Sequence, residues 1–260
     1  MDLLRLLWET TSITPEGLTA LAGLLAFAAL ILALTLRASR VGPFAVRPLA
    51  AAERVRGVLG RAMETGEPLH VALGIGGIGD VSTADTLAGL SLVSFLADRG
   101  ALAEVPVRVR LAQPTALVGA IAVLQRGAEV TGYPEAYEPT QAAFVAPVPL
   151  AYAAGTAEAL RLEPPAANAM VGAFGAEVLL PAQAGREQPQ MVQVGGTSDP
   201  STLPLLFAMT EAPLLGEEVY ALGAAFGRAD HTGSLAAQDV FRALVAFGIV
   251  LGAVLALVIA

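Results

Sequence analysis

The sequence contains no cysteine and no lysine, and it has only two histidines, His70 and His231. The lack of cysteine excludes disulfides, thiolate metal sites and cysteine nucleophiles. Because every basic residue is an arginine, mechanisms that need a Schiff-base lysine or the lysine of a phosphate-binding loop are excluded as well. Two histidines are too few for a histidine-rich metal centre, and no Ser-His-Asp spacing is present. We assign no catalytic residue and no metal ligand, and we expect no cofactor.

Charge is scarce too, at 15% of the residues against about 25% in ordinary soluble chains, and 55% of the residues are hydrophobic. The net charge of −8 argues against nucleic acid as a partner. Much of the apolar excess lies in two uncharged runs, Leu18–Leu36 and Ala243–Ala260. As helices they would span about 27 Å, close to the ~30 Å hydrocarbon core of a bilayer. Each run predicts a transmembrane helix, with the lipid bilayer as a partner.

Arginines flank the first run on one side only. Six of them lie between Arg37 and Arg61 with Glu53 as the only acid, whereas residues 1–17 carry a single arginine. Cytoplasmic segments carry the excess of positive charge, so we expect a bacterial membrane protein with a cytoplasmic middle and both termini outside. A signal peptide would carry its charge before the run, so we expect a retained anchor. The expected organisation is an external tail (1–17), a first membrane helix (18–36), a basic linker (37–47), a cytoplasmic α/β domain (48–234), and a turn leading into a second membrane helix (235–260).

Small residues recur every four positions in the second run, at Gly248, Gly252 and Ala256. In lipid, such spacing lets two helix backbones approach closely. This stripe predicts a face for self-association. Two alternatives stay open: a hairpin packed within one chain, or alanine richness without a packing role.

Between the two runs, short apolar segments alternate with helical patterns. Near-continuous apolar strands separated by helices are typical of a mostly parallel sheet covered on both faces. We predict a doubly wound, Rossmann-like α/β domain of about five strands. The expected strands are 70–74, 105–111, 142–146, 191–194 and 208–211, and the expected helices are 51–65, 83–99, 114–126, 150–162, 166–180, 200–207 and 216–226.

The turn after the first strand is rich in glycine. Gly74, Gly76 and Gly79 satisfy G-x-G-x-x-G between a strand and a helix, with Gly77 and Asp80 in the same turn. Two features oppose a dinucleotide site. The next helix begins only at Ser82, which forms a capping-box pattern with Asp85. The second strand also ends without an acid for a ribose hydroxyl. A tight structural turn and a phosphate-binding loop both remain possible interpretations.

A second turn of the same kind follows the fourth expected strand, with Gly195, Gly196, Thr197 and Asp199, and Glu217 lies in the first turn of the last expected helix of the domain. In a doubly wound sheet, all these turns gather at the carboxyl end of the strands, where ligands bind. They form our candidate ligand site together with the first turn. Asp199 is interpreted as a helix N-cap, and Glu217 as a charge that the helix dipole favours. Alternatively, Asp80, Asp199 and Glu217 converge on a cleft as acid/base groups or cation ligands.

Two other polar residues fall in apolar surroundings. His70 lies inside an expected strand and is interpreted as a core histidine with a satisfied hydrogen bond. Glu177 lies in the apolar helix expected over residues 166–180, where an unpaired charge would be costly. We therefore expect Glu177 to pair with an arginine or with Asn168.

Several segments carry a family resemblance. They are Gly74–Leu90, Pro165–Glu177, Val192–Thr197, Leu203-Pro204 and Gly216-Glu217-Glu218. On these motifs the chain resembles a family of uncharacterised bacterial membrane proteins, classed as a domain of unknown function, with two terminal membrane helices flanking one α/β domain. The resemblance implies this architecture and no activity.

The sequence supports two functional hypotheses. The first is a membrane-anchored, non-catalytic scaffold or assembly protein that forms homo-oligomers. The second is a membrane-tethered sensor or enzyme that binds a nucleotide or another phosphate-bearing metabolite at the glycine-rich turns.

Overall fold

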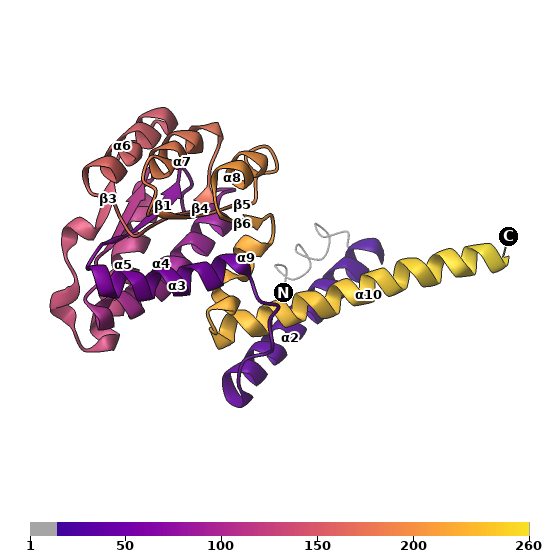
Figure 1. Ribbon diagram of the computed structural model, residues 1–260. Helices are drawn as coiled ribbons and strands as arrows, with labels where there is room; N and C mark the ends of the chain where they lie inside the picture. Colours follow the sequence, from indigo (N-terminus) through magenta and orange to yellow (C-terminus); the bar gives the residue numbers. More distant parts are fainter. Residues whose placement is uncertain (1–14, 260) are drawn as a thin grey trace, which may run out of the picture. The chain divides into compact units, whose positions relative to one another are not determined.

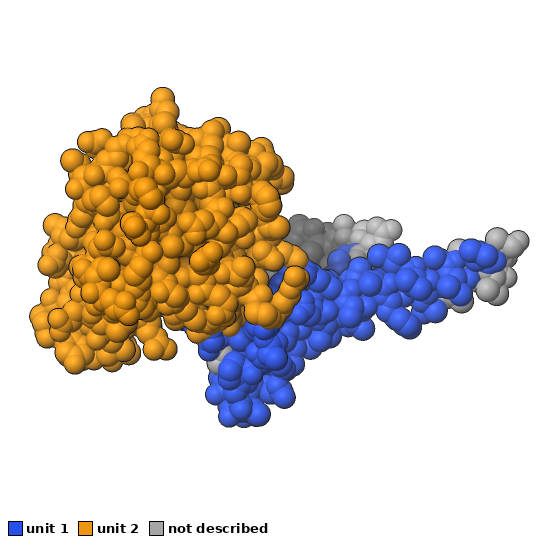
Figure 2. Space-filling model, viewed as in Figure 1, with its two compact units in different colours: residues 1–46, 227–260 blue, residues 47–226 orange. Residues whose placement is uncertain are grey.

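The computed structural model describes residues 15–259, which form two compact units (Figures 1 and 2). One unit is the segment Arg47–Phe226, and the other combines the two ends of the chain, within Met1–Val46 and Gly227–Ala260. Most of the tail predicted for residues 1–17 lies outside the described residues.

Within the described residues, six strands of the Arg47–Phe226 unit form one parallel sheet. Their order, β3-β2-β1-β4-β5-β6, reverses direction at β1. This is the order of a dinucleotide-binding Rossmann fold, so the predicted α/β class is confirmed. The strands are β1 (Leu69–Gly74), β2 (Val107–Leu111), β3 (Ala142–Phe144), β4 (Ala167–Ala173), β5 (Val192–Thr197) and β6 (Ala212–Leu215).

Helices cover both faces of the sheet (Figure 1). One face carries α3 (Ala50–Thr65), α4 (Thr83–Ala103), α5 (Pro114–Thr131) and α9 (Glu218–Ala225); the other carries α6 (Pro149–Leu162), α7 (Leu179–Arg186) and α8 (Leu203–Met209). Short 3-10 turns η1 (Pro134–Ala136), η2 (Pro139–Gln141) and η3 (Ala176–Val178) lie in the connections. The central strands β1 and β4 are therefore buried between two helical layers.

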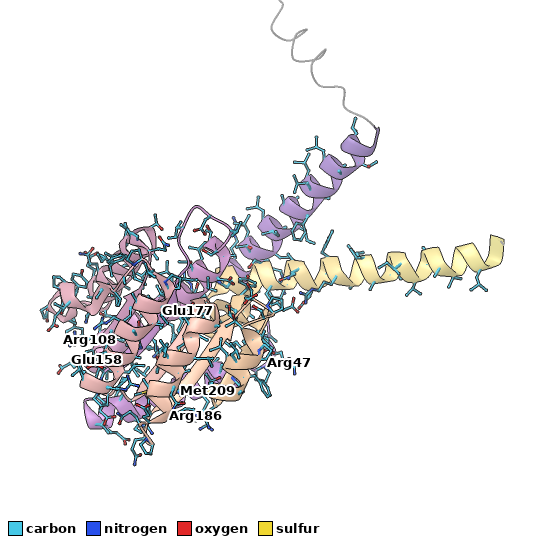
Figure 3. The ribbon with its side chains drawn as sticks, turned by 90° about the horizontal axis from the view of Figure 1, so that it is seen from above. Arg47, Arg108, Glu158, Glu177, Arg186 and Met209 are labelled. Carbon is cyan, nitrogen blue, oxygen red and sulfur yellow. The ribbon has the colours of Figure 1, made fainter. Side chains whose placement is uncertain are left out.

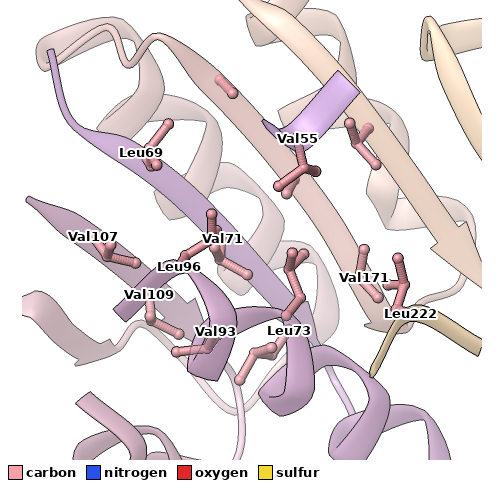
Figure 4. Close-up of a cluster of buried hydrophobic side chains, with 14 of the residues drawn as sticks. Val55, Leu69, Val71, Leu73, Val93, Leu96, Val107, Val109, Val171 and Leu222 are labelled. Atoms are coloured by element: carbon pink, nitrogen blue, oxygen red, sulfur yellow. The ribbon is translucent and has the colours of Figure 1, made fainter. Parts of the chain in front are cut away.

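The main core lies between the sheet and α3, α4 and α9 (Figure 4). Val71, Val109 and Val171 project from three adjacent strands and are fully buried there, against Val93 and Leu222 from the helices. β-Branched side chains at these positions suit the pleated surface of a sheet covered by helices. This packing holds the strands against α3, α4 and α9 and so positions the strand ends.

The opposite layer is divided by a row of polar side chains. His70, Asn168 and Gln193 lie in register on β1, β4 and β5. The Nδ1 atom of His70 lies 2.9 Å from Oδ1 of Asn168, whose Nδ2 donates to Oε1 of Gln193 at 3.2 Å. The row ends where Nε2 of Gln193 donates to the Ala182 carbonyl at 3.0 Å.

At the end of α8, Met209 contacts Arg186 of α7 (Figure 3).

Two expected elements were wrong. The segment 166–180, expected as a helix, contains the central strand β4, followed by η3 and the start of α7. Glu177 (Figure 3) is consequently half-buried in η3, where its Oε1 accepts the Gly175 N–H at 2.8 Å. Asn168 belongs to the polar row instead. The last strand lies at Ala212–Leu215 rather than at 208–211, because α8 continues to Met209.

The second unit is built on two helices, α2 (Pro15–Val41) and α10 (Ala229–Ile259). They pack closely where Gly233 meets Thr35, so closely that a Cβ on Gly233 would overlap the Thr35 backbone. The rings of Phe27 and Phe241 also meet, with their centroids 4.8 Å apart. Among the described residues, three helices are long and apolar enough to cross a membrane: Gly17–Val41, His231–Val254 and Thr83–Ala103. The last is α4, which contributes to the core of the other unit.

Candidate functional site

The carboxyl edge of the sheet is the place where this fold binds ligands, and the strand order reverses there between β1 and β4. The ends of these two strands are in direct contact. Ile75 donates its N–H to the Ala173 carbonyl at 2.8 Å. Beside it, the Gly74 N–H donates to the hydroxyl of Tyr152 at 3.0 Å, and that hydroxyl donates to the Arg110 carbonyl at 3.3 Å. Burial raises the pKa of Tyr152 well above its usual value, so the hydroxyl stays neutral and bridges β1 and β2.

In the segment Gly74–Ser82, which we call the glycine loop, four consecutive backbone N–H groups donate hydrogen bonds to side-chain hydroxyls of the protein. The N–H of Gly77 donates to Oγ of Ser82 at 2.9 Å. The N–H groups of Gly79 and Asp80 both donate to Oγ1 of Thr83, at 2.9 and 3.1 Å. The Ile78 N–H donates to Oγ1 of Thr115 at 3.0 Å. A phosphate-binding loop offers such groups to its ligand, so a phosphate here would have to displace four hydrogen bonds.

Close packing accounts for the glycines of this loop. A Cβ on Gly76 would lie 2.8 Å from the Cβ of Ala173 and equally near the hydroxyls of Ser82 and Thr86. A Cβ on Gly77 would lie 2.9 Å from Oγ1 of Thr115. Real Cβ atoms do not approach other atoms this closely, so a side chain at either position would push the loop apart. Gly79 has φ +107°, which favours glycine for conformational reasons alone.

The other predicted site residues follow the same pattern. Gly195 and Gly196 pack against α8 and β6, and Oγ1 of Thr197 accepts the Asp199 N–H at 3.3 Å. The Asp199 carboxylate accepts hydrogen bonds from the hydroxyls of Ser201 and Thr202, and these bonds lower its pKa to about 2.

Asp80 accepts both the N–H and the hydroxyl of Ser82, which lowers its pKa in the same way. Asp80 and Asp199 are thus each tied into their own turn, and Glu217 lies exposed just before α9. Among residues 15–259, no group of three or more His, Asp and Glu side chains is arranged to hold a metal ion.

One cluster at this edge was not predicted. Asp85 is buried on the first turn of α4, and its Oδ2 accepts the hydroxyl of Ser198 at 2.8 Å, while its Oδ1 accepts the hydroxyl of Tyr220 at 2.8 Å. The capping box expected between Ser82 and Asp85 is wrong, because Ser82 makes no cap bond to the helix and Asp85 faces inward. Partial burial, together with the nearby carboxylate of Asp85, raises the pKa of Tyr220.

This cluster joins α4, the turn after β5, and α9 through one carboxylate. Since both hydroxyls give their protons to Asp85, each can act only as an acceptor toward any further partner. Little in the sequence indicated this cluster, because a single Asp at a helix start is already accounted for by its favourable interaction with the helix dipole.

We expect Asp85→Ala to lower the free energy of unfolding by about 2 kcal/mol, because it removes two hydrogen bonds to a charged acceptor. Asp85→Asn keeps the shape and removes the charge, so the pKa of Tyr220 should fall in that variant, measured by ultraviolet titration with Tyr220→Phe as the blank.

Asp98 on the same helix is the matched control for the alanine substitution. Its Oδ1 is buried with no hydrogen-bond partner in the described part of the chain, so Asp98→Ala should not destabilise the fold. Equal losses for the two alanine variants would contradict the assigned role of Asp85.

Comparison with known proteins identifies a protein family. Residues 11–260 match a protein family described as a domain of unknown function, DUF6754. The chain belongs to this family. No curated protein and no solved structure matches it. The predicted resemblance to a family classed as a domain of unknown function is therefore confirmed.

Proposed function

We propose that the protein is a membrane-anchored, non-catalytic scaffold that assembles into homo-oligomers through α10. The observation that carries this proposal is the open surface around two glycines of the predicted stripe. At Gly248 and Gly252, no atom lies within 4 Å of the position that a Cβ would occupy. The contact between α2 and α10 at Gly233 leaves these glycines unused, which favours a helix of another copy over the intramolecular hairpin. The side chain of Ala256 lies outside the described residues.

The exposed apolar surface of both helices supports a membrane location. Leu24 and Leu32 on α2, and Phe247 and Ile249 on α10, are each more than half exposed. Exposing such side chains to water along two helices is unfavourable in free energy, whereas the hydrocarbon core of a bilayer accommodates them without this penalty. With the arginines that follow the first helix, the proposed location is the bacterial cell membrane, with the Arg47–Phe226 unit in the cytoplasm and both termini outside. Protease added to right-side-out cells should then leave that unit intact, and its digestion would overturn the orientation.

The geometry of the glycine loop favours the scaffold over the nucleotide or phosphometabolite sensor. Four consecutive N–H groups of that loop are occupied by hydroxyls of the protein itself. A panel of nucleotides and sugar phosphates should therefore leave the melting temperature of the full chain unchanged. A shift of several degrees with any member of the panel would favour the sensor.

The scaffold proposal predicts that Gly248→Leu with Gly252→Leu weakens self-association at least about tenfold, because bulky side chains prevent close approach of the helix backbones. The measurement is light scattering of the full chain in detergent across a dilution series. Ala246→Leu is the matched control, since it adds the same side chain on the far side of α10. Wild-type protein that is monomeric throughout the series would overturn the proposal, and so would equal losses in the variant and the control.

A further inference from the structure

The arginines that follow the apolar run of α2 lie in a stretch of the chain without an acidic residue. Residues 37–47 contain Arg37, Arg40 and Arg47, the last labelled in Figure 3, and no aspartate or glutamate, although the whole chain has a net charge of −8. Arg37 and Arg40 lie near the end of α2, and Arg47 begins the Arg47–Phe226 unit. Because guanidinium groups stay protonated at physiological pH, this segment carries three permanent positive charges.

These three charges have no counter-ion within residues 15–259. The ion pairs formed there by the arginines of α3 are those of Arg54 with Glu211 and of Arg56 with Glu53. No ion pair of the described chain involves Arg37, Arg40 or Arg47, and all three residues are exposed. Their charges are therefore available to a partner outside the chain.

Local contacts hold this segment against both helices of its unit. The Arg37 guanidinium lies over the ring of Phe44, with 4.5 Å between Cζ and the ring centroid. The N–H of Phe44 donates to Oγ1 of Thr232, near the start of α10, at 3.4 Å. The positive charge is thus kept beside the end of α2 and the start of α10.

The surface of α2 beside these arginines is apolar. Leu32, Leu36 and Val41 are all exposed, and they belong to the helix Gly17–Val41, which is long and apolar enough to cross a membrane. Arg37 and Arg40 come where such a helix would leave the hydrocarbon core. Long basic side chains at that boundary extend toward the phosphate groups of the lipids.

We propose that Arg37, Arg40 and Arg47 bind the headgroups of anionic phospholipids in the adjoining leaflet. This inference rests on the proposed membrane location and names the lipid class that it involves. A guanidinium group can donate two parallel hydrogen bonds to a phosphate, which every phospholipid carries. A zwitterionic headgroup also carries an ammonium group, which the arginines repel, whereas an anionic headgroup has a net charge that they attract. Basic residues next to a membrane helix favour anionic lipids for this reason.

The test offers the full chain in detergent an equal mixture of phosphatidylglycerol and phosphatidylcholine with matched acyl chains. Native mass spectrometry then counts the lipids that stay bound. The wild type should retain phosphatidylglycerol at least about fivefold over phosphatidylcholine, and Arg40→Gln with Arg47→Gln should remove most of this preference. Arg99→Gln with Arg126→Gln is the matched control. It removes two exposed arginines of α4 and α5 that form no ion pair in the described chain, and it should keep the preference.

Equal retention of the two lipids by the wild type would overturn the proposal, and so would an unchanged preference in Arg40→Gln with Arg47→Gln. An equal loss in the control would overturn it as well, because the preference would then follow net charge and not this segment. Glycerol phosphate, the headgroup chemistry without acyl chains, should not displace phosphatidylglycerol at matched ionic strength. Displacement would indicate a soluble anion and overturn the assignment to lipid. The same spectra report the number of copies in each particle, so loss of the lipid preference is distinguishable from failure of the scaffold proposal.

Discussion

Replacing Gly74 by alanine is expected to lower the free energy of unfolding by about 4 kcal/mol. Gly74 ends β1 with φ +79°, and a Cβ there would overlap the carbonyl oxygen of Ala173 on β4. The reverse contact is equally close, because a Cβ on Gly172 would overlap the Leu73 carbonyl. The register between β1 and β4 shifts at this point. The two central strands thus meet through glycine on both sides, where any side chain would force them apart.

Gly66 is the matched control for this prediction. It has nearly the same φ, +72°, and nothing lies within 4 Å of its Cβ position. Gly66→Ala should therefore cost only the conformational penalty, about 1 kcal/mol. Chemical denaturation of the full chain in detergent, followed by circular dichroism, measures both variants. Equal losses for the two substitutions would show that the β1–β4 contact is more adaptable than its geometry indicates.

That contact also explains why β4 was missed in the sequence. Residues 167–173 read ANAMVGA, and their alanines and methionine favour a helix by intrinsic propensity. The segment is a strand because it lies at the centre of the sheet, with hydrogen-bonded neighbours on both sides. Small residues suit the close approach to β1, which only the tertiary structure reveals. The order of the strands was out of reach for the same reason, since it depends on contacts distant in sequence.

Local patterns were reliable where local physics decides the structure. The helix starting at Pro114 was predicted correctly because proline suits a first helical turn. Strand β6 (Ala212–Leu215) contains Pro213. Proline is tolerated there because β6 is an edge strand of the sheet. The glycine loop was located from its motif, but its hydrogen bonds to Ser82, Thr83 and Thr115 were not. Asp85 is the clearest case that local patterns did not predict: its sequence context is typical of a capping box, but its side chain is buried and accepts hydrogen bonds from Ser198 and Tyr220.

The polar row carries the second large effect. Nδ2 of Asn168 donates to Gln193, so Oδ1 of Asn168 is the atom that accepts from His70. His70 therefore carries its proton on Nδ1. Its Nε2 is buried with no hydrogen-bond partner among the described residues. Protonating Nε2 would place a charge in this buried layer, and burial accordingly lowers the pKa of His70 to about 4.

The lowered pKa makes the fold sensitive to acid. The unfolded chain takes up a proton at His70 below about pH 6.5, whereas the folded chain does so only below about pH 4. Between these values the unfolded state binds more protons, so stability is full above about pH 6.5 and declines as the pH falls toward 4. Linkage sets the loss at about 3 kcal/mol between about pH 7.5 and pH 4. Such a loss is a large part of the stability of an ordinary domain.

His70→Gln isolates this contribution, because glutamine can donate to Asn168 and does not titrate. The free energy of unfolding should fall by about 3 kcal/mol less in this variant than in the wild type over the same pH range. Asp199 and Asp80 also have lowered pKa values, but they titrate identically in both proteins and cancel in the difference. Parallel stability profiles for the two proteins would mean that His70 gains a partner for Nε2 when it is protonated. The buried layer beneath α6 and α7 would then admit water, or Asn168 would rearrange toward Nε2.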